Sequence, residues 1–140
     1  MYHYKLRSAT ALTGDTVQGL IDIGFGVLVD YRIKLFGVQA SSCRLDKSIE
    51  DAKERALLKK RGMSAKNRLK ELLAFGKKQP EGLSVKTFLS PDDSQGEVCG
   101  DIKYIYARDL YNSQPGEDPW VGWKSISAQL LQEEVVDSNL

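Results

Sequence analysis

Residues 2–40 alternate between short apolar runs and turn residues, which is the pattern of β-strands joined by tight turns. A cluster of turn-forming residues at 13–16 precedes a strand over residues 17–23. The Gly-Phe-Gly sequence at 24–26 predicts a hairpin bend or bulge, and a further strand follows over residues 27–38. Gly37 lies late in that run, where a strand often kinks or ends. Together with the segment before residue 13, this part of the chain predicts three strands.

Helical spacing replaces this alternation after Ser42. Apolar side chains at positions 49, 52, 56 and 57 form one stripe among charged residues, and positions 69, 72 and 73 form a second. Gly62 separates the two stripes, Ser64 is a suitable N-cap for the second, and Gly76 lies near its end. The sequence therefore predicts a helical region with a break at Gly62.

Strand patterns return after a loop at residues 80–82. Alternation predicts strands over residues 83–89 and 98–107, separated by a turn rich in Ser, Pro, Asp and Gly. A long loop over residues 112–119 follows. A final helix is expected over about residues 126–136, with positions 126, 130 and 131 as its buried stripe.

The predicted order is three strands, a helix, two strands and a helix. This is the order of a five-stranded Greek-key OB-fold barrel, mainly β within the α+β class, with a long helical insertion after strand 3 and a C-terminal helix. An SH3-like barrel would lack the long insertion, and a ferredoxin-like fold would need a helix after its first strand. We expect residues 1–140 to form a single domain, because the length suits one core and no repeat or linker interrupts it.

Composition narrows the class of protein further. Hydrophobic residues make up 41% and charged residues 28%, which is a globular balance, and no apolar run approaches the roughly 20 residues of a membrane span. The first five residues contain no apolar signal-peptide region. Two cysteines, Cys43 and Cys99, fit neither a disulfide scaffold nor a metal site. We therefore expect a cytoplasmic protein with reduced thiols and no membrane association.

The net charge of +1 conceals an uneven distribution. Residues 44–78 contain twelve Lys or Arg and five Asp or Glu, whereas residues 91–140 contain three and ten. A basic helical segment can attract phosphate groups, although a charged run on a helix is more often a solvated face. The charges alone select neither interpretation.

Three motifs follow one another in the first forty residues: Gly-Asp-Thr-Val at 14–17, Ile-Asp-Ile-Gly-Phe-Gly at 21–26 and Arg-Ile-Lys-Leu-Phe-Gly-Val at 32–38. In this order they resemble the staphylococcal-nuclease-like, or thermonuclease, family. The resemblance covers nearly the whole chain and implies the same OB barrel, in a bacterial or phage cytoplasmic protein (in the host cytoplasm, if phage-encoded). The later segments that resemble the family's first helix, fourth and fifth strands and closing helix are 64–73, 83–88, 100–106 and 126–136.

The resemblance implies a metal site from which most ligands are missing in this chain. In the family, two aspartates of the first turn and one aspartate after the third strand help to hold a calcium ion, which prefers several charged oxygen ligands. Here Thr13 stands at the first position, Asp15 remains at the second, and Gln39 stands at the third. With one carboxylate of three, we expect no cofactor, and Ca²⁺ only if the family's site persists around Asp15.

The residues that the resemblance implies for catalysis are substituted as well. Ser42 stands where the family has the glutamate proposed to activate water, and serine is not a base at neutral pH without a partner of its own. Of the family's two phosphate-binding arginines, Arg32 matches the first, whereas Asp101 replaces the second. Lys103 lies two residues further on and would compensate in part. We hypothesise that Asp101 pairs with Arg32 across the former cleft.

Such a degenerate domain has two non-catalytic functions open to it. The first is a module that binds a protein partner on the remodelled barrel. The second is a nucleic-acid-binding relic that contacts DNA or RNA through Arg32, Lys34, Lys103 and the basic helical segment without cleaving it. Trp120 and Trp123 are expected as exposed contacts in that case.

A third function is a divalent-metal-dependent phosphodiesterase, that is, a nuclease with substituted active-site residues. Asp15, Gln39 and Asp22 would be its metal ligands, and Arg32 with Lys103 would hold the phosphate. Because four positions of the family's site are substituted together, we rank this enzyme last and the protein-binding module first.

Overall fold

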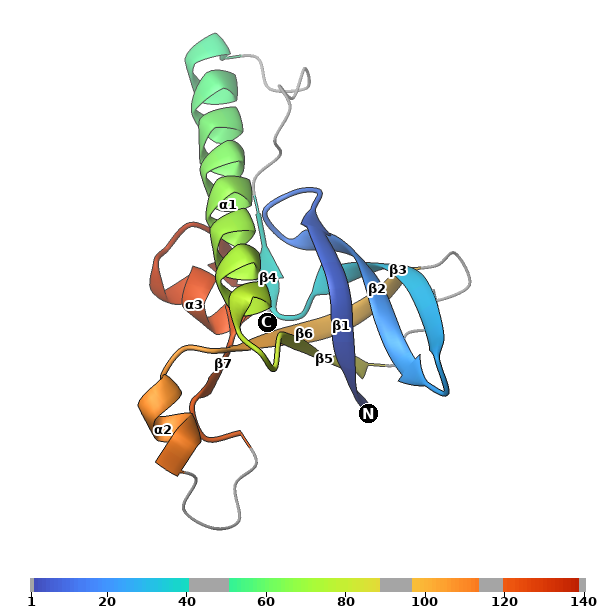
Figure 1. Ribbon diagram of the computed structural model, residues 1–140. Coiled ribbons are helices and arrows are strands. Elements are labelled where there is room, and N and C mark those ends of the chain that lie inside the picture. The colour runs from blue at the N-terminus through green and yellow to red at the C-terminus, as the bar shows by residue number, and fades with distance from the viewer. Residues whose placement is uncertain (1, 41–50, 89–96, 114–119, 139–140) are drawn as a thin grey trace.

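The computed structural model describes residues 2–40, 51–88, 97–113 and 120–138. Figure 1 shows the strands wrapped into a barrel, with a long helix standing beside one end of it. The helices are α1 (Ala52–Lys78), α2 (Arg108–Ser113) and α3 (Ile126–Gln132). The strands are β1 (Tyr2–Ala11), β2 (Thr16–Gly24), β3 (Val27–Leu35), β4 (Val38–Gln39), β5 (Leu83–Phe88), β6 (Glu97–Ile105), β7 (Trp123–Ser125) and β8 (Asp137–Ser138).

Five of these strands, β1, β2, β3, β5 and β6, form a closed mixed barrel. Antiparallel pairs join β1 to β2, β2 to β3, β1 to β5 and β5 to β6. The barrel closes where residues 32–35 of β3 pair in parallel with residues 97–100 of β6. With the long helix before β5 and α3 near the C-terminal end, this arrangement confirms the predicted mainly-β OB-type barrel.

Helix α1 is one continuous helix, so the predicted break at Gly62 is wrong. The helix begins after Asp51, whose carboxylate accepts a hydrogen bond from the Lys53 amide at 2.9 Å as an N-cap. Gly62 does not end it, because a helical glycine costs only about 1 kcal/mol relative to alanine, and because Gly62 lies on the helix's buried face. The buried residues of α1 are Gly62, Ala65, Leu69, Leu72, Leu73 and Gly76.

The core lies between the barrel strands and the two helices that pack against them. Val17, Ile33 and Ile102, from β2, β3 and β6, are fully buried. Leu69 of α1 and Leu130 of α3 belong to the same cluster. Each such side chain contributes about 1.5–3 kcal/mol when it is fully buried. The packing of α1 and α3 therefore fixes one side of the barrel.

The last helix is shorter than the sequence indicates. It ends at Gln132 rather than near Val136, because Glu134 adopts a left-handed backbone with a φ of 59°. The chain then forms β8, which pairs with β4. Asp137 of β8 also forms an ion pair with Arg61 of α1, with an Nη2–Oδ1 distance of 2.8 Å. The tail thus connects the end of β4 to the middle of α1.

Helix α2 includes residues 112 and 113, which the sequence assigned to a loop. Its first residue, Arg108, donates to both carboxylate oxygens of Glu81 at 2.9 and 2.8 Å. The guanidinium carbon also lies 5.3 Å from the centroid of the Tyr111 ring. These contacts attach the chain after β6 to the turn before β5. None of the helices in the four described ranges is both long and apolar enough to cross a membrane.

Candidate functional site

The turn between β1 and β2 positions Asp15 against two other segments of the chain. The Asp15 carbonyl accepts a hydrogen bond from the Leu35 amide at 2.8 Å, which attaches the turn to the end of β3. At Gly14, a Cβ would lie 2.6 Å from the Cβ of Ala65 and 2.7 Å from that of Ala40. A larger residue would not fit there, so Gly14 lets the turn approach α1 closely.

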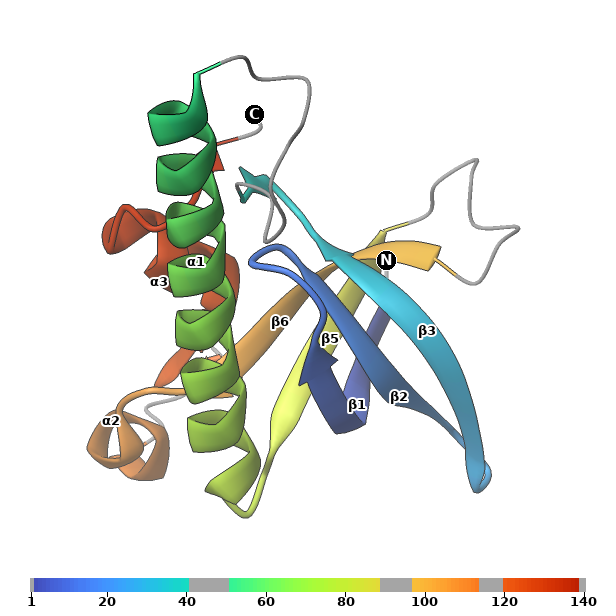
Figure 2. The same ribbon diagram turned by 90° about the horizontal axis from the view of Figure 1, so that it is seen from above.

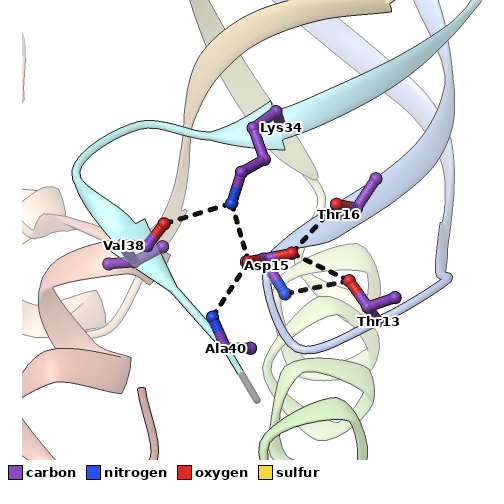
Figure 3. A network of polar contacts seen from close by, with 6 residues as sticks. All are labelled: Thr13, Asp15, Thr16, Lys34, Val38 and Ala40. Atoms are coloured by element: carbon purple, nitrogen blue, oxygen red, sulfur yellow. Dashed lines mark hydrogen bonds and ion pairs between the residues drawn. The ribbon is translucent and has the colours of Figure 1, made fainter. Parts of the chain in front are cut away.

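The Asp15 carboxylate accepts hydrogen bonds from four donors (Figure 3). Oδ1 accepts from the hydroxyls of Thr13 at 2.9 Å and Thr16 at 3.0 Å. Oδ2 accepts from the Ala40 amide at 2.9 Å and lies 2.7 Å from Lys34 Nζ. A carboxylate offers about four acceptor positions, so the protein's own donors occupy all of them.

Lys34 reaches Asp15 because of the pairing between β2 and β3. It lies opposite Thr16 in the register, and Thr16 directly follows Asp15, whose charge Lys34 neutralises. Its Nζ also donates to the Val38 carbonyl at 3.2 Å. The two charged side chains are 32% and 13% exposed, for Lys34 and Asp15 respectively. Water therefore screens this pair less than it screens an ion pair on the open surface.

The fold stabilises the ionised form of Asp15. Burial would raise the pKa of its carboxyl group, but the hydrogen bonds from Lys34, Ala40 and Thr13 together outweigh burial, so the pKa lies below its ordinary value. At neutral pH the site therefore contains one anion and one cation. The pair has no net charge with which to attract a second cation.

These residues do not fit a calcium ion. Calcium takes about six to eight oxygen ligands, and Asp15 is the one carboxylate among the described residues of this turn. Gln39 lies exposed on β4, opposite Asp137. Asp22 lies seven residues further along β2, roughly 23 Å away in an extended strand, where it pairs with Arg7 at 2.9 Å. In the four described ranges no three His, Cys, Asp or Glu side chains are grouped so as to hold a metal ion.

Arg32 and Asp101 do not meet, so the hypothesised ion pair between them does not form. Arg32 is exposed on β3, and its register partner on β6 is Glu97, four residues before Asp101. Four strand residues span roughly 13 Å. The Asp101 carboxylate instead accepts a hydrogen bond from the Ser125 hydroxyl. Ser42, the remaining substituted position, lies outside the described residues.

Lys103 lies in an aromatic cluster on the outer face of β6. Its Nζ is 4.5 Å from the centroid of the Trp120 ring, which is cation–π distance. The centroid of that ring lies 4.6 Å from the centroid of His3 and 5.5 Å from that of Trp123. Both tryptophans are half-buried rather than fully exposed. Burial, with the charges of Lys103 and Lys86, lowers the pKa of His3 and so favours the neutral form of its ring.

A second aromatic pair continues this outer face. The rings of Phe36 and Phe88 stack with centroids 4.7 Å apart, and Lys86 Nζ lies 5.6 Å from the Phe88 centroid. The register places Lys86 between His3 of β1 and Asp101 of β6. Rings and ammonium groups thus share one face of the sheet. We call this set the aromatic–lysine strip: His3, Phe36, Lys86, Phe88, Lys103, Trp120 and Trp123.

The side of the barrel away from α1 has an exposed apolar surface. The β2–β3 hairpin extends there, at a distance from all three helices (Figure 2). At its tip Phe25 is fully exposed, and the exposed fractions of Ile23, Val27 and Leu28 are 45%, 46% and 49%. We call residues 23–28 the hairpin tip. Beside it lies a cavity of about 210 Å³, here the barrel-mouth cavity, lined by Tyr4, Ile21, Ile23, Tyr31, Thr87, Phe88 and Val98.

Sequence reasoning missed three features of these surfaces. It placed Lys34 on a nucleic-acid surface, whereas the structure places its ammonium group on Asp15. It did not single out Phe25, although the side chain of a bulky residue between two glycines of a hairpin turn is expected to point outward into solvent. It also missed Phe88, because alternation alone does not show which outward-facing aromatic residues will meet.

Comparisons of the chain with protein-family models, with curated proteins and with solved structures find no match. The family resemblance therefore consists of the ordered motifs, and the structure adds the five-stranded barrel with its long helix. Any function must be argued from the surfaces described above.

Replacing Lys34 by methionine removes the ammonium group and keeps an unbranched side chain. Asp15 then keeps a partly buried charge without its cation, so we expect the free energy of unfolding at neutral pH to fall by about 1–3 kcal/mol. Arg32→Met is the matched control, because Arg32 is exposed on the same strand and forms no ion pair with another described side chain. It should change the unfolding free energy by less than about 0.5 kcal/mol. Equal losses in urea unfolding would contradict the role assigned to Lys34.

The low pKa of Asp15 makes its contribution to stability depend on pH. Because the pKa is lower in the fold than in the unfolded chain, where it is about 3.9, the contribution is complete above that pH and is lost as the pH falls through the folded-state pKa. Asp15→Asn cannot ionise, so it should lose less unfolding free energy than the wild type between about pH 7 and about pH 3. Urea unfolding at both pH values measures this; identical losses would assign the acid sensitivity to other carboxyl groups.

Proposed function

We propose that this chain is a catalytically degenerate, staphylococcal-nuclease-like module that binds a protein partner through the hairpin tip and the barrel-mouth cavity. The observation that supports this most directly is Phe25, a fully exposed aromatic side chain at the outermost turn of the hairpin. An exposed group of apolar residues beside an apolar cavity is characteristic of an interaction surface.

Phe25 occupies a backbone conformation that costs free energy. Its φ is 57° and that of Gly26 is 74°, so two consecutive residues are left-handed. Hairpin turns of this kind favour Asn-Gly, and a residue with a Cβ pays about 1–2 kcal/mol to adopt the conformation. The exposed ring gains no burial that would offset this cost. Strain of this type concentrates at functional sites, which supports contact between Phe25 and another molecule.

The charges around the hairpin tip favour a protein partner over a lipid surface. Asp22 and Asp30 flank the uncharged residues 23–29. Asp22 pairs with Arg7, and Asp30 accepts a hydrogen bond from Gln18. Anionic headgroups would be repelled by the carboxylate of Asp30, which has no cation against it among the described ion pairs, whereas Arg7 already neutralises Asp22. A protein groove can accept the apolar tip and offer donors to the carboxylates at its rim.

The donors that already surround the Asp15 carboxylate support a non-catalytic role. Calcium-dependent cleavage of the kind implied by the resemblance needs a cation on this carboxylate, and Lys34 already supplies one. A divalent ion would have to displace the ammonium group and then find several further oxygen ligands. We therefore assign the site around Asp15 to the stability of the barrel.

Phe25→Asn separates binding from stability. Asparagine tolerates the left-handed conformation, so we expect the free energy of unfolding to rise by about 1 kcal/mol, while binding to the partner is lost. The measurement is a comparison of proteins retained from cell extract by the immobilised wild type and by the variant, together with urea unfolding of both.

The matched control is Leu57→Gln, because Leu57 is an exposed apolar residue of α1, with 67% of its surface accessible. Glutamine is a good helix former, so this variant should retain the same proteins as the wild type. If Phe25→Asn and Leu57→Gln retain the same proteins from the extract, and equal amounts of purified wild-type chain added to it, the hairpin tip is not the binding surface and the proposal fails.

The aromatic–lysine strip supports a second candidate function, binding of single-stranded nucleic acid without cleavage. Such binding combines rings on which bases stack with cations that contact the phosphates. Lys103 over Trp120 and Lys86 over Phe88 provide two such combinations on one face. Arg32 and Lys34, which the sequence assigned to this role, do not belong to the strip.

This candidate predicts retention of single-stranded DNA that weakens steeply with salt. Lys103→Gln should weaken retention and reduce the slope of log affinity against log salt by about one. Lys59→Gln, in the basic part of α1, is the control and should leave both unchanged.

The same incubations, with calcium or with EDTA, also measure cleavage of DNA and RNA. We expect no cleavage in either condition. Calcium-dependent cleavage that is lost in Asp15→Ala would contradict the non-catalytic assignment and restore the third function. Absence of retention by the wild type would exclude the strip as a nucleic-acid surface.

A further inference from the structure

We infer that the partner of the hairpin tip is a second copy of this chain, which pairs the exposed edge of its β3 with the same edge of the first copy. The inference rests on the proposed function, because it names the occupant of the same surface. Two observations support it, an unpaired strand edge and an exposed tip beside an apolar cavity, and the edge allows a symmetric register between two copies.

The first half of β3 has an unpaired edge. On one side, β2 pairs with β3 over its whole length. On the other side, β6 pairs with residues 32–35 only, and within the described ranges no strand lies against residues 27–31. These residues, Val-Leu-Val-Asp-Tyr, are mostly good strand formers. The N–H and C=O groups that point away from β2 have no strand partner among the described residues, and such groups are a template for pairing with another chain.

A two-fold axis at Val29 would pair two such edges antiparallel. Val27 of one copy would then lie opposite Tyr31 of the other, and Leu28 opposite Asp30. Residues directly opposite each other share a face of the sheet, so the two barrel mouths would open toward the same side. No two carboxylates would lie directly opposite, so the register avoids repulsion between like charges.

The tip and the cavity are complementary within this arrangement. Phe25 lies two residues beyond Val27, so it would extend past Tyr31 of the second copy toward the start of its β6. Tyr31 and Val98, which line the barrel-mouth cavity, are the residues at that place. The cavity of about 210 Å³ has aromatic and aliphatic walls that suit a phenyl ring.

The tip and the cavity also adjoin in one molecule, because Ile23 of the tip lines the cavity. A two-fold interface requires this, because each copy must donate the tip and accept that of the other through a single surface. The strained conformation of Phe25 then has a specific role, which is to direct the ring out of its own hairpin and into the neighbouring barrel.

Sedimentation equilibrium of the purified chain, from micromolar to millimolar concentration, tests the inference. We expect a reversible dimer whose dissociation constant rises at least about tenfold in Phe25→Asn, as for the loss of an interface anchor. Leu57→Gln is the matched control: its side chain is an exposed apolar one as well, but it lies on α1, outside both the hairpin tip and β3. It should leave the dissociation constant within about threefold of the wild type.

A disulfide tests the register independently of affinity. Cys43 and Cys99 are first replaced by serine. In that background Val29→Cys places the new thiol of one copy opposite the new thiol of the other across the two-fold axis. Mild oxidation should then yield a covalent dimer. Thr10→Cys, on an exposed part of β1, should remain monomeric under the same conditions. Equal cross-linking of both variants would overturn the proposed register.

The outcomes separate this inference from the proposed function. A wild type that stays monomeric at every concentration, yet retains another protein through Phe25, overturns the inference and leaves the proposed function standing. A monomer that retains nothing through Phe25 overturns both. A dimer that Phe25→Asn does not weaken overturns the role of the hairpin tip in self-association.

Discussion

The carboxylate of Asp15 connects parts of the chain that have little else in common. Through its four hydrogen bonds it joins the first turn, the end of β3 and the residue that follows β4. The close approach of Gly14 to α1 depends on the same turn geometry. A buried carboxylate is costly unless every acceptor position is satisfied, and the ammonium group of Lys34 is the donor that also cancels the charge. The pair therefore helps to hold the turn and the strand end in position, together with the backbone hydrogen bond from Leu35 to Asp15.

Most of the fold could be predicted from the spacing of apolar residues, because strands and helices with one buried face repeat an apolar residue every two to four positions. The runs around residues 17–23 and 83–89 became β2 and β5, and Gly37, with a φ of 80°, ends the ladder after β3 as expected. Gly62 misled the prediction because a glycine on a buried helix face is stabilised by packing that the local sequence does not show. The left-handed Glu134 that shortens α3 has no sequence signal of its own.

The candidate site was harder to predict, because it depends on which residues of different strands lie opposite each other. Lys34 and Asp15 are nineteen positions apart, and only the register of β2 with β3, which starts from the turn at Phe25 and Gly26, brings them together. Counting outward from that turn would have paired Lys34 with Val17, and only the β-bulge between Asp22 and Gly24 shifts the register so that Lys34 lies opposite Thr16. No such counting gives the distance between Arg32 and Asp101, because it depends on the parallel pairing of β3 with β6, which starts at Glu97 and which no turn sets. The family resemblance indicated which of the family's residues this chain lacks, but not which contacts Asp15 and Asp101 make in its place.

The parallel pairing of β3 with β6 has a consequence for how the chain folds. It joins Arg32 to Glu97, 65 positions along the chain, whereas the hairpin of β2 with β3 and the turns of α1 are local. Contacts between distant residues form slowly, because the intervening chain must lose entropy before any contact offsets that loss. During this interval the whole edge of β3 is open, and not only its first half. Newly made chains at high concentration would therefore compete with β6 for that edge, so the yield of correctly closed barrels should depend on how dilute the chains are while they fold.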